Sequence, residues 1–477
     1  MAFNSLAFFL FLPAAFALHW LAGAKNRAAQ NAILIAASYV FYGWVDWRLP
    51  GLVAFSTLAF FGAALGIERA GSARAKRAYG LGCVALALGL LGYFKYANFF
   101  TAGLADALRG VGVGVSWPAL KILLPAGISF YIFKTLGYAL DVWHGKMRAT
   151  RDLAAFAAYA AFFPQLLAGP IESARRFLPQ FLGARRFDVE SATDGCRQML
   201  WGFFKKAVVA EACAPAAVKI FNHWDAASPP QLALGAALFA FQIYADFSGY
   251  SDIAEGCGRL FGFDTARNFA TPYFSRDIAE FWRRWHISLT TWFREHVYIP
   301  LGGSRRGKWR ALSNTLAVFC VSGLWHGANW TFVAWGLFHG LLFAPLLLLG
   351  RNRRHVDGVV AGGRHLPRPT ELFSMLATFA LVCVGWVFFN AKTVGDACGY
   401  LARMATGWGD GGLAVNTSGC WWGVAVMLAV EWRMRGEAHG LRAGRWPGWS
   451  RWLAYAALGV ACLGMFKQSS TFIYFQF

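Results

Sequence analysis

Apolar side chains are grouped in long runs along the chain, and short polar segments separate one run from the next. A helix needs about 20 apolar residues to cross a bilayer, and most of the runs approach this length. The pattern predicts helical spans at residues 6–21, 32–45, 52–67, 81–100, 122–140, 199–212, 232–245, 372–389, 421–430 and 452–466. We therefore expect an all-α polytopic membrane protein that forms a single integral-membrane domain over residues 1–477.

The charged residues support this class and indicate how the chain is oriented. The chain is 57% hydrophobic and 14% charged, whereas soluble domains carry about 25% charge. Its 45 Lys and Arg exceed its 24 Asp and Glu, which gives a net charge of +21. Positive charges gather on the cytoplasmic loops of membrane proteins, and this explains the excess better than a nucleic-acid partner. The basic loops predicted to be cytoplasmic lie at 25–27, 74–77, 146–151, 305–310, 351–354 and 433–435.

Two further apolar segments are not simple spans under this charge rule. Residues 312–349 form a run about twice the length of one span, with basic loops on both sides. They are predicted to form a hairpin of two short helices that bends near His326. Residues 153–168 also lie between basic segments, so we expect them to be re-entrant. The whole chain then makes about 12 crossings, with both termini outside.

The charges near the N-terminus do not indicate a cleaved signal peptide, and the cysteine spacing does not indicate a metal site. No Lys or Arg precedes Lys25, so residues 6–21 lack the basic region of a signal peptide and are expected to remain as the first span. The nine cysteines are scattered, without a C-x-x-C pair or a Cys/His cluster. The sequence therefore indicates no metal site and no redox site.

His326 lies in the sequence GLWHGANW at 323–330, in the middle of the hairpin segment. An ionisable side chain at this depth is costly and is a candidate functional residue. The glycines and Asn329 beside it disfavour one continuous helix, and irregular backbone at membrane depth requires surrounding protein or a water-filled cavity. Histidine accepts and returns a proton near neutral pH. We predict that His326 lines a cavity and acts as a proton acceptor.

A second histidine, His286, lies in the segment DIAEFWRRWHISLTTWFREHVYIP at 277–300. On a 3.6-residue period one face collects Trp282, Trp285, His286, Leu289, Trp292 and Phe293. This pattern predicts an amphipathic helix that lies in the cytoplasmic interface. A histidine on an apolar face is more often a hydrogen-bonded structural residue than a catalyst, so both interpretations of His286 stay open.

Two carboxylates, Asp246 and Asp252, lie in the segment FQIYADFSGYSDIAE at 241–255. Carboxylates in a span or at its mouth are usually paired or functional. The predicted roles are to orient a histidine or to pair with an arginine. For Asp252, a helix that simply ends nearby is an equally good interpretation.

Seven motifs along the chain resemble those of a known family. They are FYGW at 41–44, FPQLLAGPI at 163–171, YADFSGYSD at 244–252, FWRRWHISL at 281–289, YIPLGG at 298–303, WHGANW at 325–330 and FIYFQF at 472–477. The chain resembles the membrane-bound O-acyltransferase family, and within it the bacterial branch of alginate O-acetyltransferase membrane subunits. The resemblance extends over nearly the whole chain. His296 stands where relatives carry Tyr, so it receives no role.

The resemblance implies a fold and an active site. The fold is a ring of about 11–12 transmembrane helices, with re-entrant and interfacial helices, around a central funnel. His326 corresponds to the active-site histidine and His286 to the second motif histidine. His326 would take the proton of the acceptor hydroxyl, while His286 or the Asn329 amide stabilises the oxyanion. The residues expected to support this pair are Asn329, Asp246, Asp252 and Trp325.

The implied activity is transfer of an acetyl group from a cytoplasmic thioester donor, such as acetyl-CoA, across the bacterial inner membrane. The implied acceptor is an exported polysaccharide such as alginate, cellulose or peptidoglycan, and no bound cofactor is expected. The implied partner is a periplasmic acetyltransferase of the SGNH-hydrolase type. The residues that could hold coenzyme A phosphates are Arg283, Arg284, Arg305, Arg306 and Lys308, although cytoplasmic loop topology explains them equally well.

Two alternatives remain at this point. The first is an acyltransferase of the same family that acts on a lipid or a D-alanyl carrier, which the motifs of the alginate branch disfavour. The second is a proton-coupled transporter that uses Asp246 and His326 as a relay. Such a transporter predicts inverted repeats, which the sequence does not show.

Overall fold

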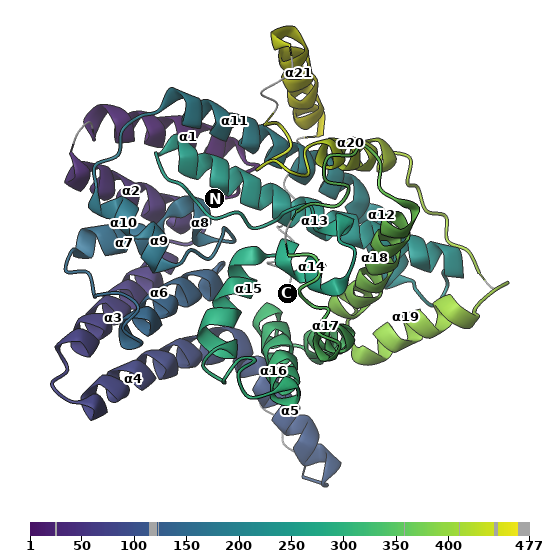
Figure 1. Ribbon diagram of the computed structural model, residues 1–477, viewed down its shortest axis with the longest axis horizontal. Helices are drawn as coiled ribbons and strands as arrows, with labels where there is room; N and C mark the ends of the chain where they lie inside the picture. Colours follow the sequence, from purple (N-terminus) through teal and green to yellow (C-terminus); the bar gives the residue numbers. More distant parts are fainter. Residues whose placement is uncertain are drawn as a thin grey trace. The chain divides into compact units, whose positions relative to one another are not determined.

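The computed structural model describes residues 1–23, 26–113, 122, 124–356, 358–409, 411–442 and 447–465 (Figure 1). This part of the chain is built of helices and turns without a β-strand, so the predicted all-α class is confirmed. Lys25 and the motif at 472–477 lie outside the described residues. Contacts within the chain define two compact units, and a single domain over the whole chain stays a prediction.

The first unit holds residues Leu10–Phe187 with Met1 and Gly327–Asn329. Helix α1 (Leu6–Ala17) leads into it. Its other helices are α2 (Arg27–Gly43), α3 (Leu49–Arg69), α4 (Ala73–Leu91), α5 (Ala97–Gly110), α6 (Ile128–Trp143), α7 (Leu153–Ala161), α8 (Phe163–Leu166), α9 (Ala174–Phe177) and α10 (Pro179–Leu182).

Helix α6 is buried along almost its whole length. Its Lys134 donates a hydrogen bond from Nζ to Oε1 of Gln165 at 2.9 Å, and the ammonium lies 4.6 Å from the centre of the Tyr159 ring. Helix α7 has only nine residues and so rises about 14 Å, too little to cross a hydrocarbon core of about 30 Å. This length agrees with the re-entrant segment expected at residues 153–168, which stays a prediction.

The second unit holds residues Ala2–Phe9, Asp188–His326 and Trp330–Phe477, within the described part of the chain. Its helices are α11 (Val189–Phe203), α12 (Glu211–Asn222), α13 (Pro229–Leu260), α14 (Ile278–Arg284), α15 (Ile287–Phe293), α16 (Lys308–His326), α17 (Trp330–Leu348), α18 (Pro369–Asn390), α19 (Val394–Thr406), α20 (Trp421–Arg433) and α21 (Gly448–Met465). A π-helical turn, η3 (Phe204–Ala210), joins α11 to α12, and a second, η5 (Arg294–Tyr298), follows α15.

Several helices have the length and composition of membrane spans. Within the described residues, five are long and apolar enough to cross a membrane: Leu49–Arg69, Ala73–Gly110, Pro229–Leu260, Trp330–Leu348 and Pro369–Asn390. This confirms the polytopic class. The count of about 12 crossings and the direction of each stay predictions.

Helix α13 is the longest element of the second unit and extends beyond its predicted apolar run. It has 32 residues and continues to Leu260, past both Asp246 and Asp252. The interpretation that the helix ends near Asp252 is therefore wrong. The helix can continue because its polar residues are buried against α11 and η3, where they find partners.

Helices α11 and α13 lie side by side (Figure 1) and approach closely at paired glycines. A Cβ added to Gly202 would lie 2.6 Å from the carbonyl oxygen of Gly249, and one added to Gly195 would lie 2.7 Å from that of Gly256. Small residues at such crossings allow two backbones to pack directly against each other. The contact fixes α11 and the following turn η3 against the polar face of α13.

The hairpin predicted for residues 312–349 is confirmed. Helix α16 ends at His326, helix α17 begins at Trp330, and the two pack against each other. Gly323 and Gly336 bring the helices close together, because a Cβ at either position would meet a backbone carbonyl oxygen at 2.2 Å.

The single amphipathic helix predicted for 277–300 is wrong. The segment forms α14 and α15, separated by an extended Trp285 and by His286, which has φ 42° and ψ 55° in the left-handed region. The predicted apolar face is nevertheless mostly buried, at Trp282, Trp285, His286, Leu289 and Phe293. The periodicity identified which side chains face inward but did not detect the break between the helices.

Gly249→Ala is expected to destabilise the contact between α11 and α13. The added Cβ would lie 2.7 Å from the carbonyl oxygen of Gly202, and overpacking of this kind costs about 1–3 kcal/mol. The purified protein should therefore unfold at a lower temperature.

Gly89→Ala in α4 is the matched control, since a Cβ there meets nothing within 4 Å. It should leave the unfolding temperature unchanged or raise it, because Ala is the better helix former. Equal unfolding temperatures for Gly249→Ala and the unmodified protein would contradict the close approach.

Candidate active site

His326 is the last residue of α16 and is buried, with 4% of its surface exposed. Three aromatic rings pack around it at near right angles. The ring centres of Trp325 and Trp335 lie 5.0 Å from that of His326, and the ring centre of Phe389 in α18 lies 5.4 Å away. The hairpin thus places the imidazole within a largely apolar, aromatic environment, and the expectation that His326 lines a cavity stays a prediction.

His286 is held at the break between α14 and α15. A left-handed backbone costs a residue with a Cβ about 1–2 kcal/mol, so other contacts must maintain it. The backbone N–H of Ile287 donates to the carbonyl of Asn268 at 2.9 Å, and the N–H of Ala270 donates to the carbonyl of Arg284 at 3.0 Å. The extended segment before α14 therefore pairs with the break and fixes its geometry.

The structure brings the two predicted catalytic histidines to the same region of the second unit. The ring centre of Trp325 lies 6.0 Å from that of His286 and 5.0 Å from that of His326. Trp325 therefore contacts both imidazoles, and its supporting role stays a prediction. Asn329 follows in the connection Gly327–Asn329 and is half-buried.

The side chain of His286 contacts Asn268, a residue that the sequence analysis missed. Nδ1 of His286 lies 3.1 Å from Oδ1 of Asn268, and both residues are almost completely buried. Burial disfavours the charged form and lowers the pKa of His286 below its usual range. The ring is therefore neutral at neutral pH.

A third buried histidine, His339, also escaped the sequence analysis. It lies in α17 with no exposed surface, and its ring centre is 5.1 Å from that of Trp282 and 5.2 Å from that of Trp335. Its ring nitrogens have no hydrogen-bond partner among the described residues. The signal that could have identified it was present, because an ionisable residue inside a predicted span is itself a functional candidate.

Asp246 and Asp252 are paired with buried lysines of the turn η3. The Nζ of Lys205 lies 2.7 Å from Oδ2 of Asp252, and the Nζ of Lys206 donates to Oδ1 of Asp246. The predicted partners were a histidine or an arginine, whereas the observed partners are two lysines inside the predicted span at 199–212. Opposite charges that must be buried are usually paired in this way.

Hydrogen bonds connect this ionic cluster to Asn268. Nε2 of Gln198 donates to Oδ1 of Asp252 at 2.9 Å and to Oε2 of Glu255 at 2.8 Å. The other oxygen of Glu255 accepts the backbone N–H of Asn268 at 3.2 Å. A continuous polar network therefore extends from Lys205 through α13 to the residue that contacts His286.

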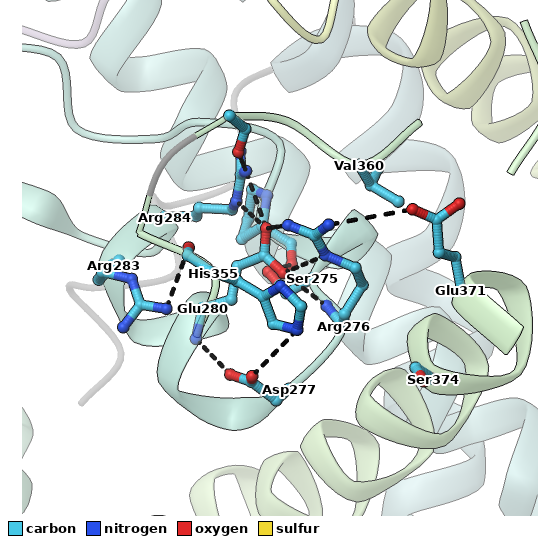
Figure 2. A network of polar contacts seen from close by, with 12 residues as sticks. Ser275, Arg276, Asp277, Glu280, Arg283, Arg284, His355, Val360, Glu371 and Ser374 are labelled. Carbon is cyan, nitrogen blue, oxygen red and sulfur yellow. Dashed lines mark hydrogen bonds and ion pairs between the residues drawn. The ribbon is translucent and has the colours of Figure 1, made fainter. Parts of the chain in front are cut away.

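Arg283 and Arg284 clamp a loop onto α14. Arg284 donates to Glu280, to the carbonyl of Ala270 at 3.1 Å and to that of Gly358 at 3.1 Å. Arg283 donates to the carbonyls of Asn352 and His355. Figure 2 shows Glu280 between Arg276 and Arg284, with Arg283 directed at the neighbouring loop.

The carboxylate at the centre of this clamp remains ionised. Burial raises the pKa of Glu280, but the hydrogen bonds from Arg276 and the charge of Arg284 outweigh it, so the pKa is held below its usual range. These contacts account for the guanidinium groups of Arg283 and Arg284 without a bound phosphate. Arg305 and Arg306, by contrast, lie on an exposed loop before α16, and the exposed Lys308 is the first residue of that helix.

A cavity of about 440 Å³ lies among α14, α15, η5, α16 and α17. Most of its lining is apolar and includes Trp282, Leu289, Phe293, Val318, Phe319 and Phe343. Arg294, Arg353 and Ser304 also line it, and Ser304 directly precedes the exposed basic loop. On the α16 side the lining includes Ser322, which is one helical turn before His326.

The fold and the site together define a class, a polytopic helical protein with buried histidines beside a cavity. A sequence model of the membrane-bound O-acyltransferase family matches residues 147–366. The chain is 41% identical over 413 residues to the probable alginate O-acetylase of Azotobacter vinelandii, which covers 85% of this chain and 78% of that protein. The chain therefore belongs to the membrane-bound O-acyltransferase family, as its motifs predict.

Two further relatives agree with this assignment. The probable alginate O-acetylase of Pseudomonas aeruginosa is 40% identical over 402 residues, covering 83% of this chain and 73% of that protein. The peptidoglycan O-acetyltransferase of Helicobacter pylori is 32% identical over 434 residues, covering 85% of this chain and 80% of that protein. The chain is thus a multi-pass membrane acyltransferase that uses an acyl donor.

Arg284→Ala is expected to lower stability while leaving the binding of the acyl donor unchanged. The substitution removes bonds to two backbone carbonyls and one of the cations paired with the buried Glu280. Loss of a hydrogen bond made by a charged group costs about 1.5–3 kcal/mol. The checks are the thermal unfolding temperature and the KM for the donor, and a raised KM without loss of stability would contradict the clamp.

Proposed function

We propose that this protein is a membrane O-acetyltransferase that serves the O-acetylation of an exported polysaccharide. The observation that carries the proposal is the buried His326, one helical turn from a cavity and joined to His286 through Trp325. The relatives at 32–41% identity are each named as an O-acetylase or O-acetyltransferase, which indicates that the transferred acyl group is acetyl. The alginate and peptidoglycan relatives indicate that the acceptor is an exported polysaccharide.

His326 acts as the general base of this reaction. It takes the proton of an acceptor hydroxyl while the hydroxyl oxygen attacks the carbonyl carbon of the acetyl thioester. A C–O bond forms, the C–S bond breaks, and the proton passes from the imidazole to the departing thiolate. The developing oxyanion needs a hydrogen-bond donor, for which the Asn329 amide and the ring of His286 are the candidates.

The cavity beside α16 is the proposed site of the donor's acyl arm. Its apolar lining suits a flexible chain that carries a thioester, and Ser322 marks the end nearest His326. The exposed cations Arg305, Arg306 and Lys308 follow the lining residue Ser304 in the sequence and suit the phosphates of acetyl-CoA. This placement favours the exposed loop over Arg283 and Arg284 as the phosphate contact.

The chain's location and partner follow from the same chemistry. A thioester donor is cytoplasmic, whereas an exported polysaccharide is not, so we place the protein in the bacterial inner membrane. A periplasmic acetyltransferase of the SGNH-hydrolase type is the proposed recipient of the acetyl group. An acyltransferase that acts on a lipid or a D-alanyl carrier, and a proton-coupled transporter, remain the alternatives that a transfer assay separates.

His326→Ala should abolish acetyl transfer from acetyl-CoA without affecting insertion into the membrane. General-base catalysis contributes about 10²–10⁴-fold, so kcat should fall by at least the lower figure. His223→Ala, at an exposed histidine after α12, is the control and should retain full activity. Full activity of purified, correctly inserted His326→Ala protein would overturn the assignment.

The double substitution Arg305→Ala with Arg306→Ala should raise the KM for acetyl-CoA and leave kcat nearly unchanged. Exposed ion pairs are worth up to about 1 kcal/mol each, so a roughly tenfold rise in KM is expected. The matched control is Arg74→Ala with Arg77→Ala, an exposed basic pair on α4. An equal KM for both double variants would place the donor elsewhere.

A further inference from the structure

Asn268 is a completely buried amide in the extended segment between α13 and α14. It makes contacts to both sides of the break that carries His286. Its backbone carbonyl accepts the N–H of Ile287 at 2.9 Å, and its Oδ1 lies 2.8 Å from Oγ of Ser288 and 3.1 Å from Nδ1 of His286. One residue thus contacts the backbone and the ring of the same histidine.

The surrounding groups decide which way the amide of Asn268 is turned. The backbone N–H of Ser288 can only donate, and it faces the amide atom assigned as Oδ1 at 3.4 Å. The other amide atom, Nδ2, lies 3.2 Å from Oγ of Ser251, a hydroxyl that can accept. The oxygen of Asn268 therefore faces His286, and the amide nitrogen faces α13.

The orientation of the amide sets the tautomer of the imidazole. Because the amide oxygen only accepts hydrogen bonds, Nδ1 of His286 must carry the proton that bridges them. Burial keeps the ring neutral, since it lowers the pKa of His286. In a neutral ring with a proton on Nδ1, Nε2 carries a lone pair and accepts.

The polar network on α13 holds Asn268 in this orientation. Glu255 accepts its backbone N–H at 3.2 Å, and Gln198 joins Glu255 to Asp252, which is paired with Lys205. All the members of this network come from the second unit. The orientation of one imidazole is thereby tied to an ionic cluster formed by α13 and η3.

We propose that Asn268 is a positioning residue that fixes His286 as the Nδ1–H tautomer, so that Nε2 is its hydrogen-bond acceptor in the reaction. The proposal rests on the acetyltransferase function proposed above. It makes Nε2 of His286 an acceptor of hydrogen bonds from the substrate, while the proton of the attacking hydroxyl goes to His326, and it removes the neutral ring's Nε2 from the candidates for oxyanion donor. The Asn329 amide then remains as the candidate donor to the oxyanion.

The test combines Asn268→Leu, which has a similar shape and no acceptor, with Asn268→Asp, which keeps the oxygen toward His286. In the second variant the Ser251 hydroxyl can turn and donate to the new carboxylate. Asn268→Leu should lower kcat for acetyl transfer about 10²-fold with KM unchanged, and Asn268→Asp should restore most of it. Asn268→Ala serves as a second variant without an acceptor if the leucine variant does not insert.

A double-mutant cycle separates positioning from general stability. In a His286→Ala background, Asn268→Leu should lower kcat by no more than about twofold, because residues that act as a unit are not additive. Ser288→Ala is the matched control, since it removes another buried bond to the same oxygen and should retain most activity. Equal losses of kcat from Asn268→Leu with and without His286 would overturn the proposal.

The outcomes also separate this proposal from the proposed function. Absence of acetyl transfer by the unmodified protein would refute the function itself. Normal transfer by the unmodified protein, loss in His286→Ala and full activity in Asn268→Leu would refute only the role of Asn268. Rescue by Asn268→Asp alongside loss in Asn268→Leu supports it, because a merely space-filling residue would give the reverse order.

Discussion

Pairing of buried polar groups is the constraint on which the second unit depends. Helix α13 carries two aspartates and a glutamate into the apolar interior of its unit, and buried carboxyl groups are tolerated only when they are paired or hydrogen-bonded. Lysines on η3 and the amide of Gln198 meet that requirement. The glycines of α11 and α13 allow the approach that these bonds need. Backbone packing and side-chain pairing are therefore two aspects of one contact.

The same constraint extends to the chemistry of the site. A neutral imidazole beside aromatic rings costs less to bury than a charged one, and both His286 and His326 lie among such rings. Their orientation has to come from hydrogen bonds that the apolar rings cannot supply. For His286 these bonds lead through Asn268 to the ionic cluster on α13. A site built in this way depends on residues that never contact substrate.

Features set by local sequence were predictable. The length of the run at 312–349 and its flanking charges gave the hairpin and the position of His326 within it. The 3.6-residue period gave the buried face of residues 282–293. The apolar runs gave the helical class, although they ended α13 too early because its later turns carry buried polar residues. Motif resemblance, rather than periodicity, supplied the family.

Features set by contacts between distant residues were not predictable. The left-handed backbone at His286 is stabilised by Asn268, eighteen positions earlier. No local sequence pattern indicates that these two residues are in contact. The partners of Asp246 and Asp252 come from η3, about forty to fifty positions away. Two adjacent lysines of η3, which is wound as a π-helical turn, meet carboxylates that lie six positions apart on α13. Removing one residue from that turn would rotate everything after it by about 100°, so this stretch of the chain should tolerate exchange of side chains far better than insertions or deletions.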